Sequence, residues 1–421
     1  MSIYFDHSAT TPMDSKVLEA MQPYWQEHFG NASSIHSYGG QAAVAVDMAR
    51  AKIAEILQVK PTEIIFTSGA TEANNLAIKG LVNGLKLRGI ICPHIITSAV
   101  EHDAVLEPLN LLEAEKQITL TILPVNKQGI VSAEDLRQAI KPETVLVSVM
   151  YVNSEVGSVQ PITELSTVVK QANNEKLANW SHLSVSERGD KPQLIYFHSD
   201  ATQAPNYFDC GLENLGVDML SLSAHKMYGP KGSGLLAVKG NVPLVALLHG
   251  GHHERNWRSG TLNVPGIVGL GEALALATLN REKNAVKVAE VRDYLVKRIV
   301  EEMSKVVLNT PLENNSPSHA HFSFLGAEGE SILMALDLEA GIAVSTGSAC
   351  ASNTLGASKV LLAMGIKVED THGAIRFTLG KHNTREDIDE LMKHLPGVVK
   401  KFRDMAPDLT PYQGKGVTAH H

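Results

Sequence analysis

The middle of the chain alternates short β-rich runs with amphipathic stretches, and this alternation restricts the fold more than any other feature of the sequence. Such a pattern is typical of an α/β protein with a mainly parallel sheet. We expect strands at residues 63–67, 95–98, 145–150, 194–198 and 218–221. We expect helices at residues 15–27, 41–57, 72–86 and 162–173.

At 421 residues the chain is longer than one hydrophobic core usually supports, so we expect two domains. The pattern changes near Thr261, where a long helical segment (266–302) and then mixed elements predict a second, smaller domain. The expected parts are an N-terminal arm associated with the small domain (1–15), a large domain (16–262), the small domain (263–405) and a loose tail (406–421). The polar segment 171–192 is long for a connection, and we interpret it as a surface insertion, with a partner-binding loop as the alternative.

Composition excludes several functional classes. The net charge of -8 argues against a nucleic-acid surface, which needs a basic face to displace counterions from phosphates. The cysteines Cys92, Cys210 and Cys350 are widely spaced and form no C-x-x-C pair, which disfavours a disulfide framework or a structural zinc site. The N-terminus lacks the features of a signal peptide, and the longest apolar stretch (266–279) is too short to cross a bilayer. We therefore expect a cytoplasmic protein.

Polar residues follow each expected strand, at the edge where ligands bind in open α/β sheets. The clusters are 67–72, Glu101 with His102, 153–155, His198 with Asp200 and Gln203, and Ser223 with His225 and Lys226. Because they follow separate strands of one expected sheet, these clusters indicate one built site.

The residue types in the clusters point to an anionic ligand and a reactive amine. Small residues at 68–70 let a helix N-terminus present free N–H groups to an anion, although an ordinary helix cap is equally compatible. Lys226, at the end of a buried strand, can present an uncharged amine for a Schiff base, and Lys231 in a Gly/Pro turn is the competing candidate. Asp200 suits a pairing with a pyridinium nitrogen or, alternatively, a helix cap.

Cys350 is the candidate nucleophile among the cysteines. It follows an apolar run and is surrounded by small residues, so its thiol would be accessible. Cys92 lies in an apolar run and Cys210 has no base beside it in the sequence, so we interpret both as structural.

A series of strings over nearly the whole chain resembles the cysteine desulfurases of the class V aminotransferase family, in the NifS/IscS-like branch. In chain order they begin with D-H-S-A-T-T-P (6–12), G-N-A-S-S-I-H (30–36), F-T-S-G-A-T-E-A-N-N-L-A-I (66–78) and E-H-D-A-V (101–105). They continue with H-S-D-A-T-Q (198–203), D-M-L-S-L-S-A-H-K-M-Y-G-P-K-G-S-G (218–234), R-S-G-T-L-N (258–263), S-T-G-S-A-C (345–350) and R-F-T-L-G (376–380).

The resemblance implies a pyridoxal-phosphate-dependent transferase of fold type I, similar to aspartate aminotransferase. The large domain would carry a mainly parallel sheet and the cofactor, a smaller α+β domain would complete it, and the protein would be a homodimer with shared sites. Pyridoxal 5'-phosphate would be attached to Lys226. His102 would stack on its ring and assist proton transfer, Asp200 would pair with the ring nitrogen and Gln203 would contact the ring hydroxyl.

The resemblance also implies the remaining site residues and the reaction. The phosphate ligands would be Ala70, Thr71, Ser223 and His225, with Thr261 reaching the phosphate from the second subunit. Asn153 and Arg376 would hold the substrate carboxylate, a role that suits the fork of an arginine. L-cysteine would become L-alanine, and Cys350 would receive the sulfur as a persulfide and pass it to an acceptor protein, an iron–sulfur scaffold or a tRNA-thiolation relay.

Departures from the family pattern leave alternatives open. Ser154 stands in the usual N-N-E string, His253 replaces a common Gln, and the 171–192 segment exceeds that of most members. Adjacent His252 and His253 rarely share one ion, so we expect no metal site. A selenocysteine lyase, a plain class V aminotransferase and a binding module without cofactor remain alternatives, and the last is disfavoured because the lysine, aspartate and phosphate loop are all present.

Overall fold

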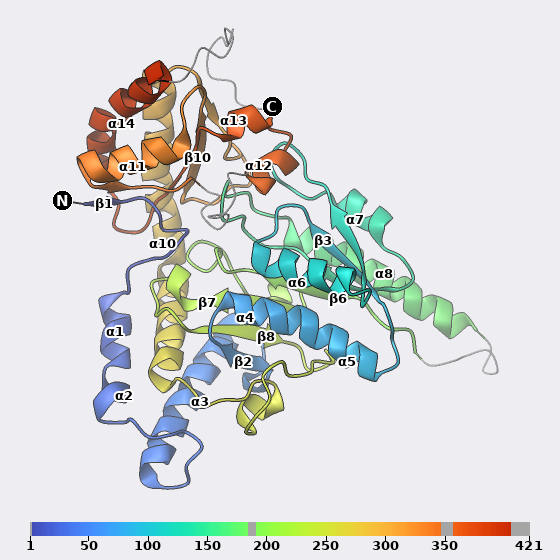
Figure 1. The fold of residues 1–421 in the computed structure, drawn as a ribbon. Coiled ribbons are helices and arrows are strands. Elements are labelled where there is room, and N and C mark those ends of the chain that lie inside the picture. Colours follow the sequence, from blue (N-terminus) through green and yellow to red (C-terminus); the bar gives the residue numbers. More distant parts are fainter. Residues whose placement is uncertain (1, 184–190, 347–356, 406–421) are drawn as a thin grey trace.

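The computed structural model describes residues 2–183, 191–346 and 357–405 (Figure 1). Its centre is a seven-stranded sheet in the order β2-β8-β7-β6-β5-β3-β4. The strands are β2 (Ile64–Thr67), β3 (His94–Ser98), β4 (Thr119–Leu123), β5 (Thr144–Ser148), β6 (Tyr196–Asp200), β7 (Met219–Ser223) and β8 (Gly234–Val238). Only β8 pairs antiparallel with its neighbours, so the expected mainly parallel sheet is confirmed.

Both faces of this sheet are covered by helices, as parallel sheets require. One face packs on α4 (Ala70–Asn75), α5 (Leu81–Leu87) and α6 (Asp103–Ala114), and the other on α3 (Ser37–Leu57), α8 (Ile162–His182) and α10 (Val264–Glu302). Neighbouring strand residues alternate between the two layers: Ile64 and Phe66 belong to the second, Ile65 to the first. The near-continuous apolar runs of the sequence follow from burial on both faces.

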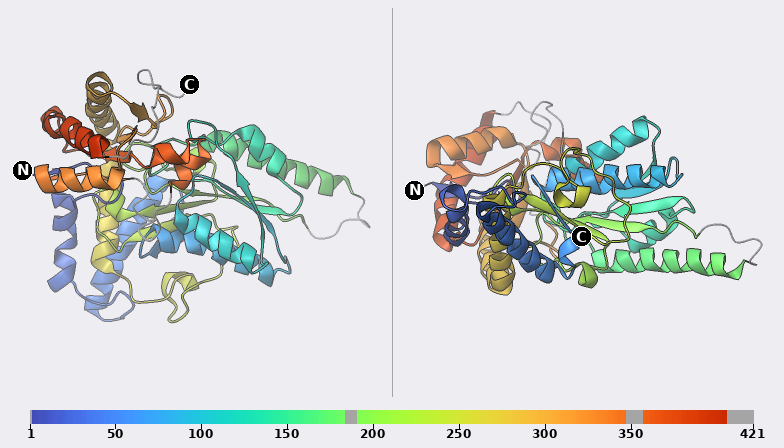
Figure 2. Two further views of the ribbon diagram at one scale, coloured as in Figure 1. Left: turned by 45° about the horizontal axis from the view of Figure 1, so that its top comes forward. Right: turned by 90° about the horizontal axis from the view of Figure 1, so that it is seen from below.

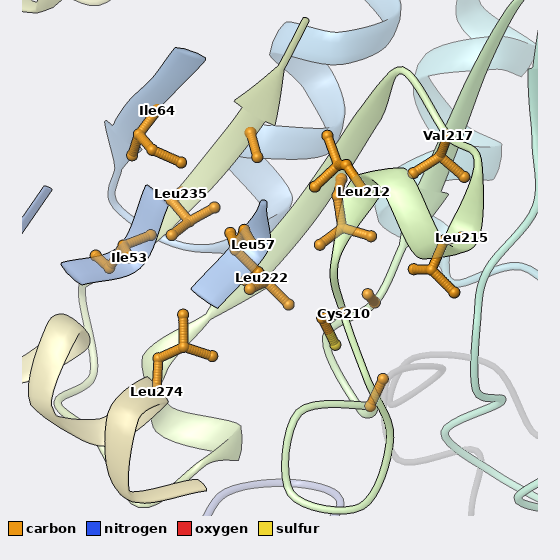
Figure 3. Packing of buried hydrophobic residues seen from close by; sticks show 14 of the residues in the cluster. Ile53, Leu57, Ile64, Cys210, Leu212, Leu215, Val217, Leu222, Leu235 and Leu274 are labelled. Atoms are coloured by element: carbon orange, nitrogen blue, oxygen red, sulfur yellow. The ribbon is translucent and has the colours of Figure 1, made fainter. Parts of the chain in front are cut away.

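Cys210 belongs to the layer between the sheet and α3, α8 and α10 (Figure 3). Figure 3 shows it among side chains of the sheet and of this helical layer, near Leu212 and Leu222. Burial raises the pKa of its thiol, so the thiol is neutral and unreactive there. A packing role agrees with the interpretation of Cys210 as structural.

All four expected helices differ from the observed boundaries. Helix α3 begins at Ser37 instead of residue 41, and the helix expected at 72–86 divides into α4, a π-helical stretch (Leu76–Gly80) and α5. The N-terminal helix divides into α1 (Ser15–Met21) and α2 (Pro23–Gln26), because Pro23 lacks the N–H that would continue α1 and instead starts a new helix. Helix α8 was expected to end at residue 173 but continues to His182, since no glycine or proline interrupts that stretch. The first half of the 171–192 segment is therefore helix, and α8 extends beyond the sheet (Figure 2).

Lys176 attaches the extended part of α8 to the sheet. Lys176 Nζ donates to the carbonyl oxygens of Pro142 and Thr144, each at 2.9 Å, where β5 begins. Residues 184–190 lie outside the described part of the chain.

A second core is built on β9 (Val306–Leu308), β10 (His319–Phe324) and β12 (Ala374–Thr378), covered by α11 (Gly329–Ala340) and α14 (Arg385–Met405). The N-terminal arm joins this core: β1 (Ile3–Tyr4) pairs in parallel with β11 (Ile342–Ala343), and Ile3 and Phe5 are buried in it.

Helix α10 belongs to both cores. Its residues from Val264 to Ala277 pack on the large sheet, and those from Val288 to Ile299 pack in the second core. The helix begins just after the expected boundary at residues 262–263, yet its first half packs in the core of the large sheet, so the division into domains stays a prediction. None of the helices in the described ranges is long and apolar enough to span a membrane.

Candidate active site

A cavity of about 840 Å³ lies at the carboxyl ends of β2, β3, β5, β6 and β7. The arm residues Ser8, Ala9 and Thr10, Arg376 of β12 and Ser358, the N-cap of α12 (Lys359–Ala363), also line it. The cavity brings together most of the expected site residues: Ala70, Thr71, His102, Asn153, Asp200, Gln203, Ser223, His225, Lys226 and Arg376. Thr261 does not line it, and Cys350 lies outside the described residues.

Lys226 ends the short 3-10 helix that follows β7. Its Nζ donates to the carbonyl oxygens of Ser8, at 2.5 Å, and Ala9, at 2.7 Å, so the arm holds the amine in the cavity. Lys231 also lines the cavity but is exposed, whereas Lys226 is half-buried. The position of Lys226 favours it over Lys231 as the reactive amine.

Asp200 is the last residue of β6 and is buried at the cavity floor. Its two oxygens accept hydrogen bonds from Asn74 Nδ2 at 2.7 Å and from the backbone N–H of Thr202 at 3.0 Å. The next helix, α9 (Leu212–Leu215), begins well beyond Asp200, so this carboxyl does not cap a helix. A buried carboxylate fixed on two sides suits a pairing with a cationic ring nitrogen.

His102 and Glu101 stand side by side at the end of the β3 segment. His102 is the N-cap of α6, where its Nδ1 accepts the N–H of Ala104 at 3.0 Å, so in the neutral ring the proton is on Nε2. Glu101 is buried, and burial raises its pKa to about 8. The sequence placed Glu101 in a polar cluster with His102, but no role was predicted for it. Its position directly before His102 was the feature that indicated a place in the site.

The first turn of α4 forms the anion end of the cavity. Ala70 and Thr71 begin this helix and therefore carry free N–H groups, and the hydroxyl of Ser223 has no hydrogen-bond partner among the described residues. Gly234 allows the close packing here, because a Cβ on it would lie 2.6 Å from the Cα of Gly69. These unpaired donors fit a phosphate group.

His225 closes the same end of the cavity. Its Nδ1 lies 3.2 Å from the hydroxyl oxygen of Thr10. Burial, with help from the charges of Lys226 and Lys231, lowers the pKa of His225 to about 4. The ring is therefore neutral at pH 7 and can donate one N–H to an anion.

Arg376 and Asn153 lie at the opposite end. The Arg376 guanidinium is buried; Nη2 contacts Asp6 Oδ1 at 2.7 Å and Nη1 donates to the carbonyl oxygen of Ser154 at 2.9 Å. The amide of Asn153 is bonded to backbone groups: Oδ1 accepts the N–H of Glu155 and Val156 in its own loop, and Nδ2 donates to the Val100 carbonyl, in the loop after β3, at 3.0 Å.

Thr261 lies outside this cavity within a single chain. It is exposed and follows Arg258, whose Nε donates to Glu72 Oε1 at 2.7 Å in the first turn of α4. Nearby, His253 Nδ1 accepts the N–H of Gly260 at 3.3 Å and His252 Nδ1 lies 2.6 Å from Asn256 Oδ1. No group of three His, Cys, Asp or Glu residues suitable for a metal ion occurs within the described ranges.

The model of the class-V aminotransferases matches residues 3–178 and 186–391 of the chain. The chain belongs to this family. Within it the chain falls among the cysteine desulfurases: the cysteine desulfurase IscS of Dictyoglomus turgidum is 44% identical over 405 residues, covering 96% of each protein. The expected family and fold class are confirmed.

Solved structures agree with the sequence comparison. A NifS-like protein superimposes with a TM-score of 0.82 at 35% identity, covering 96% of this chain and 99% of that one. A structure described as SspA in complex with cysteine superimposes with a TM-score of 0.74 at 33% identity, covering 91% of this chain and 100% of that one.

Proposed function

We propose that this class-V family member binds pyridoxal 5'-phosphate in the cavity and acts as a desulfurase that converts L-cysteine to L-alanine. The observation that carries the proposal is the meeting of three groups in one cavity: the amine of Lys226, the fixed carboxylate of Asp200 and the open first turn of α4. These groups match the aldehyde, the ring nitrogen and the phosphate of this cofactor. The cofactor, when bound, supplies an electron sink for the charge left at the substrate Cα.

The residues around the cavity would hold the cofactor as follows. Lys226 would attach the aldehyde, Asp200 would keep the ring nitrogen protonated and His102 would cover one face of the ring. Gln203 would donate to the ring hydroxyl oxygen. The N–H groups of Ala70 and Thr71, the hydroxyl of Ser223 and the neutral ring of His225 would bind the phosphate. Once released, the amine of Lys226 would take the proton from Cα as a general base.

Arg376 would hold the substrate carboxylate. A guanidinium offers two parallel N–H donors to a carboxylate, and burial in the cavity wall strengthens such charged hydrogen bonds. Asn153 lies at the same end, but because its amide is engaged with the surrounding backbone, we propose that it contributes by shaping the loop that ends at Glu155.

Cys350 would take the sulfur from the substrate. The proposal rests on the S-T-G-S-A-C string (345–350) and on the likeness to cysteine desulfurases. The Cys350 thiolate would form an S–S bond to the substrate sulfur. The C–S bond of the substrate would break at the same time, and its electron pair would stay on the substrate carbon. Addition of a proton to that carbon then gives the methyl group of alanine. The sulfur would pass to an acceptor protein, an iron–sulfur scaffold or a tRNA-thiolation relay.

We further propose a cytoplasmic homodimer. Large apolar side chains are exposed on α2, on α3 and on the connection between them: Trp25, Phe29, Ile35, Tyr38 and Met48. Exposed apolar groups gathered in this way mark interaction surfaces, and a second copy would cover them and offer its Thr261 to the phosphate. The free cysteines Cys92 and Cys210 agree with a reducing compartment.

The proposed activity is tested with the purified holoenzyme and L-cysteine. Alanine and sulfide are measured with a reductant present. Mass spectrometry of proteolytic peptides, prepared without reductant, is expected to find one added sulfur on the peptide that contains Cys350. The Cys350→Ala variant should keep the cofactor and lose the added sulfur, whereas Cys92→Ala should keep both. A keto acid as the product, or an added sulfur on Cys92 or Cys210, would contradict the proposal.

A further inference from the structure

The N-terminal arm carries the string D-H-S-A-T-T-P (6–12), to which the proposed function assigns no role. In the structure this arm reaches both ends of the cavity. Ser8 accepts a hydrogen bond from Lys226 and another from Gln203 Nε2, at 2.9 Å, while Asp6 contacts Arg376. One short segment therefore contacts the groups proposed for the cofactor and the group proposed for the substrate carboxylate.

The arm is fixed to the strand that carries Arg376. The N–H of Thr378 donates to the Phe5 carbonyl at 2.7 Å, and the N–H of Ser8 donates to the Thr378 hydroxyl at 2.9 Å. Thr378 lies on β12, two positions after Arg376. These backbone hydrogen bonds hold the segments of Asp6 and Arg376 beside each other. The 2.7 Å ion pair between the two side chains therefore does not require two flexible surface side chains to become ordered.

The charge of Arg376 also acts on a second carboxyl, that of Glu155. Glu155 lines the cavity on the Arg376 side, and its carboxyl accepts a hydrogen bond from Ser358. Burial raises the pKa of Glu155 to about 7, so this carboxyl is partly ionised at neutral pH. His321 on β10 faces the same carboxyl, with Nε2 at 3.7 Å from Oε1.

We propose that Asp6 is a positioning residue: it pairs with Arg376 and keeps the guanidinium directed at the substrate carboxylate instead of at Glu155. Two contacts define the orientation, Asp6 at Nη2 and the Ser154 carbonyl at Nη1, and Ser8 Oγ steadies the second by donating to the same carbonyl at 2.7 Å. Nε of Arg376 is buried and has no hydrogen-bond partner among the described residues, so the guanidinium is held through Nη1 and Nη2. The inference rests on the proposed function, because the carboxylate role of Arg376 is part of it.

The test compares holoenzyme variants with ligands that do or do not carry a carboxylate. In Asp6→Asn, KM for cysteine and Kd for alanine should each rise at least tenfold, which corresponds to about 1.4 kcal/mol, while kcat changes less. Cysteamine, which lacks the carboxylate, should bind the variant and the wild type alike. Asp6→Glu should recover part of the loss, and Glu155→Gln in the Asp6→Asn background should recover part by removing the competing charge.

Asp218→Asn is the matched control, because Asp218 is a partly buried carboxyl that lies outside the cavity and accepts a backbone N–H, from Phe197. It should leave KM and the alanine Kd unchanged. Unchanged alanine binding in Asp6→Asn, or an equal loss of cysteamine binding, would overturn the positioning role. If the wild type makes no alanine from cysteine, the proposed function itself fails, and the two failures are thereby distinguished.

Discussion

Two lysines line the cavity, and their surroundings predict different consequences of removal. Lys226→Ala should abolish the covalent attachment of the cofactor and all turnover, because the amine held by Ser8 and Ala9 is lost. Lys231→Ala should keep the attachment, since Lys231 is exposed at the rim and contributes charge at the phosphate end. The measurement is the absorbance band of the attached cofactor. A band that survives in Lys226→Ala and disappears in Lys231→Ala would reverse the assignment.

The buried carboxyl of Glu101 should make the free energy of unfolding depend on pH. Burial, and to a lesser extent the charge of Asp200, raises its pKa from the ordinary 4.5 to about 8 in the folded protein. The folded state therefore keeps this proton above pH 4.5 while the unfolded chain releases it, so stability is lost as the pH rises towards 8. Glu101→Gln should match the wild type below pH 4.5 and become more stable by up to a few kcal/mol at pH 8.

Urea unfolding at several pH values measures this difference. The Gln side chain can still accept the hydrogen bonds from Ser98 and Met150, so the comparison isolates the ionisation. Parallel stability curves for the two proteins from pH 5 to pH 8 would contradict a protonated Glu101.

At the scale of elements, the approach of β8 to the start of α4 depends on Gly234. A methyl group there would lie 2.6 Å from Gly69 Cα and 2.7 Å from the Leu222 carbonyl oxygen, and both are backbone atoms that cannot rotate away. Gly234→Ala should cost about 1–3 kcal/mol of stability and weaken the binding of pyridoxal phosphate, because the first turn of α4 would be displaced. Unfolding midpoints and cofactor titration of the apoprotein measure both effects.

Gly240→Ala is a suitable control for that experiment. Gly240 follows β8, and a methyl group on it would meet only Glu63 Oε1, at an ordinary 3.6 Å. Equal cofactor affinity in the Gly234→Ala variant and this control would show that the close approach is unimportant.

The sequence predicted the elements whose signal is local. Every expected strand overlaps an observed one, and Lys226, Asp200 and Thr71 share a cavity because strand ends of a parallel sheet meet at one edge. The pairing of Asp6 with Arg376 could not be predicted, since 370 positions separate them and hydrophobic periodicity carries no information on such contacts. For the same reason the hydrogen bond from Asn153 to the Val100 carbonyl, 53 positions away, could not be predicted.

At the scale of the whole molecule, we predict a dimer formed through the exposed apolar side chains of α2 and α3, and its dissociation can be measured. Ile35 is fully exposed among the apolar side chains of the α2 and α3 region, so Ile35→Glu should dissociate the subunits and lower the affinity for the cofactor. Leu338→Glu, an exposed position on α11, is the matched control and should stay dimeric. Sedimentation velocity at assay concentration distinguishes the states, and a fully active wild-type monomer would contradict the prediction.

Helix α10 has 39 residues and, at about 1.5 Å per residue, is roughly 58 Å long. Its two ends are buried in different cores, whereas Leu279 and Val286 between those ends are exposed. If either core melted, half of this helix would lose its packing and the other half would fray at a new, uncapped end. The two cores should therefore melt as one cooperative unit, and calorimetry of the protein should record a single heat-absorption peak.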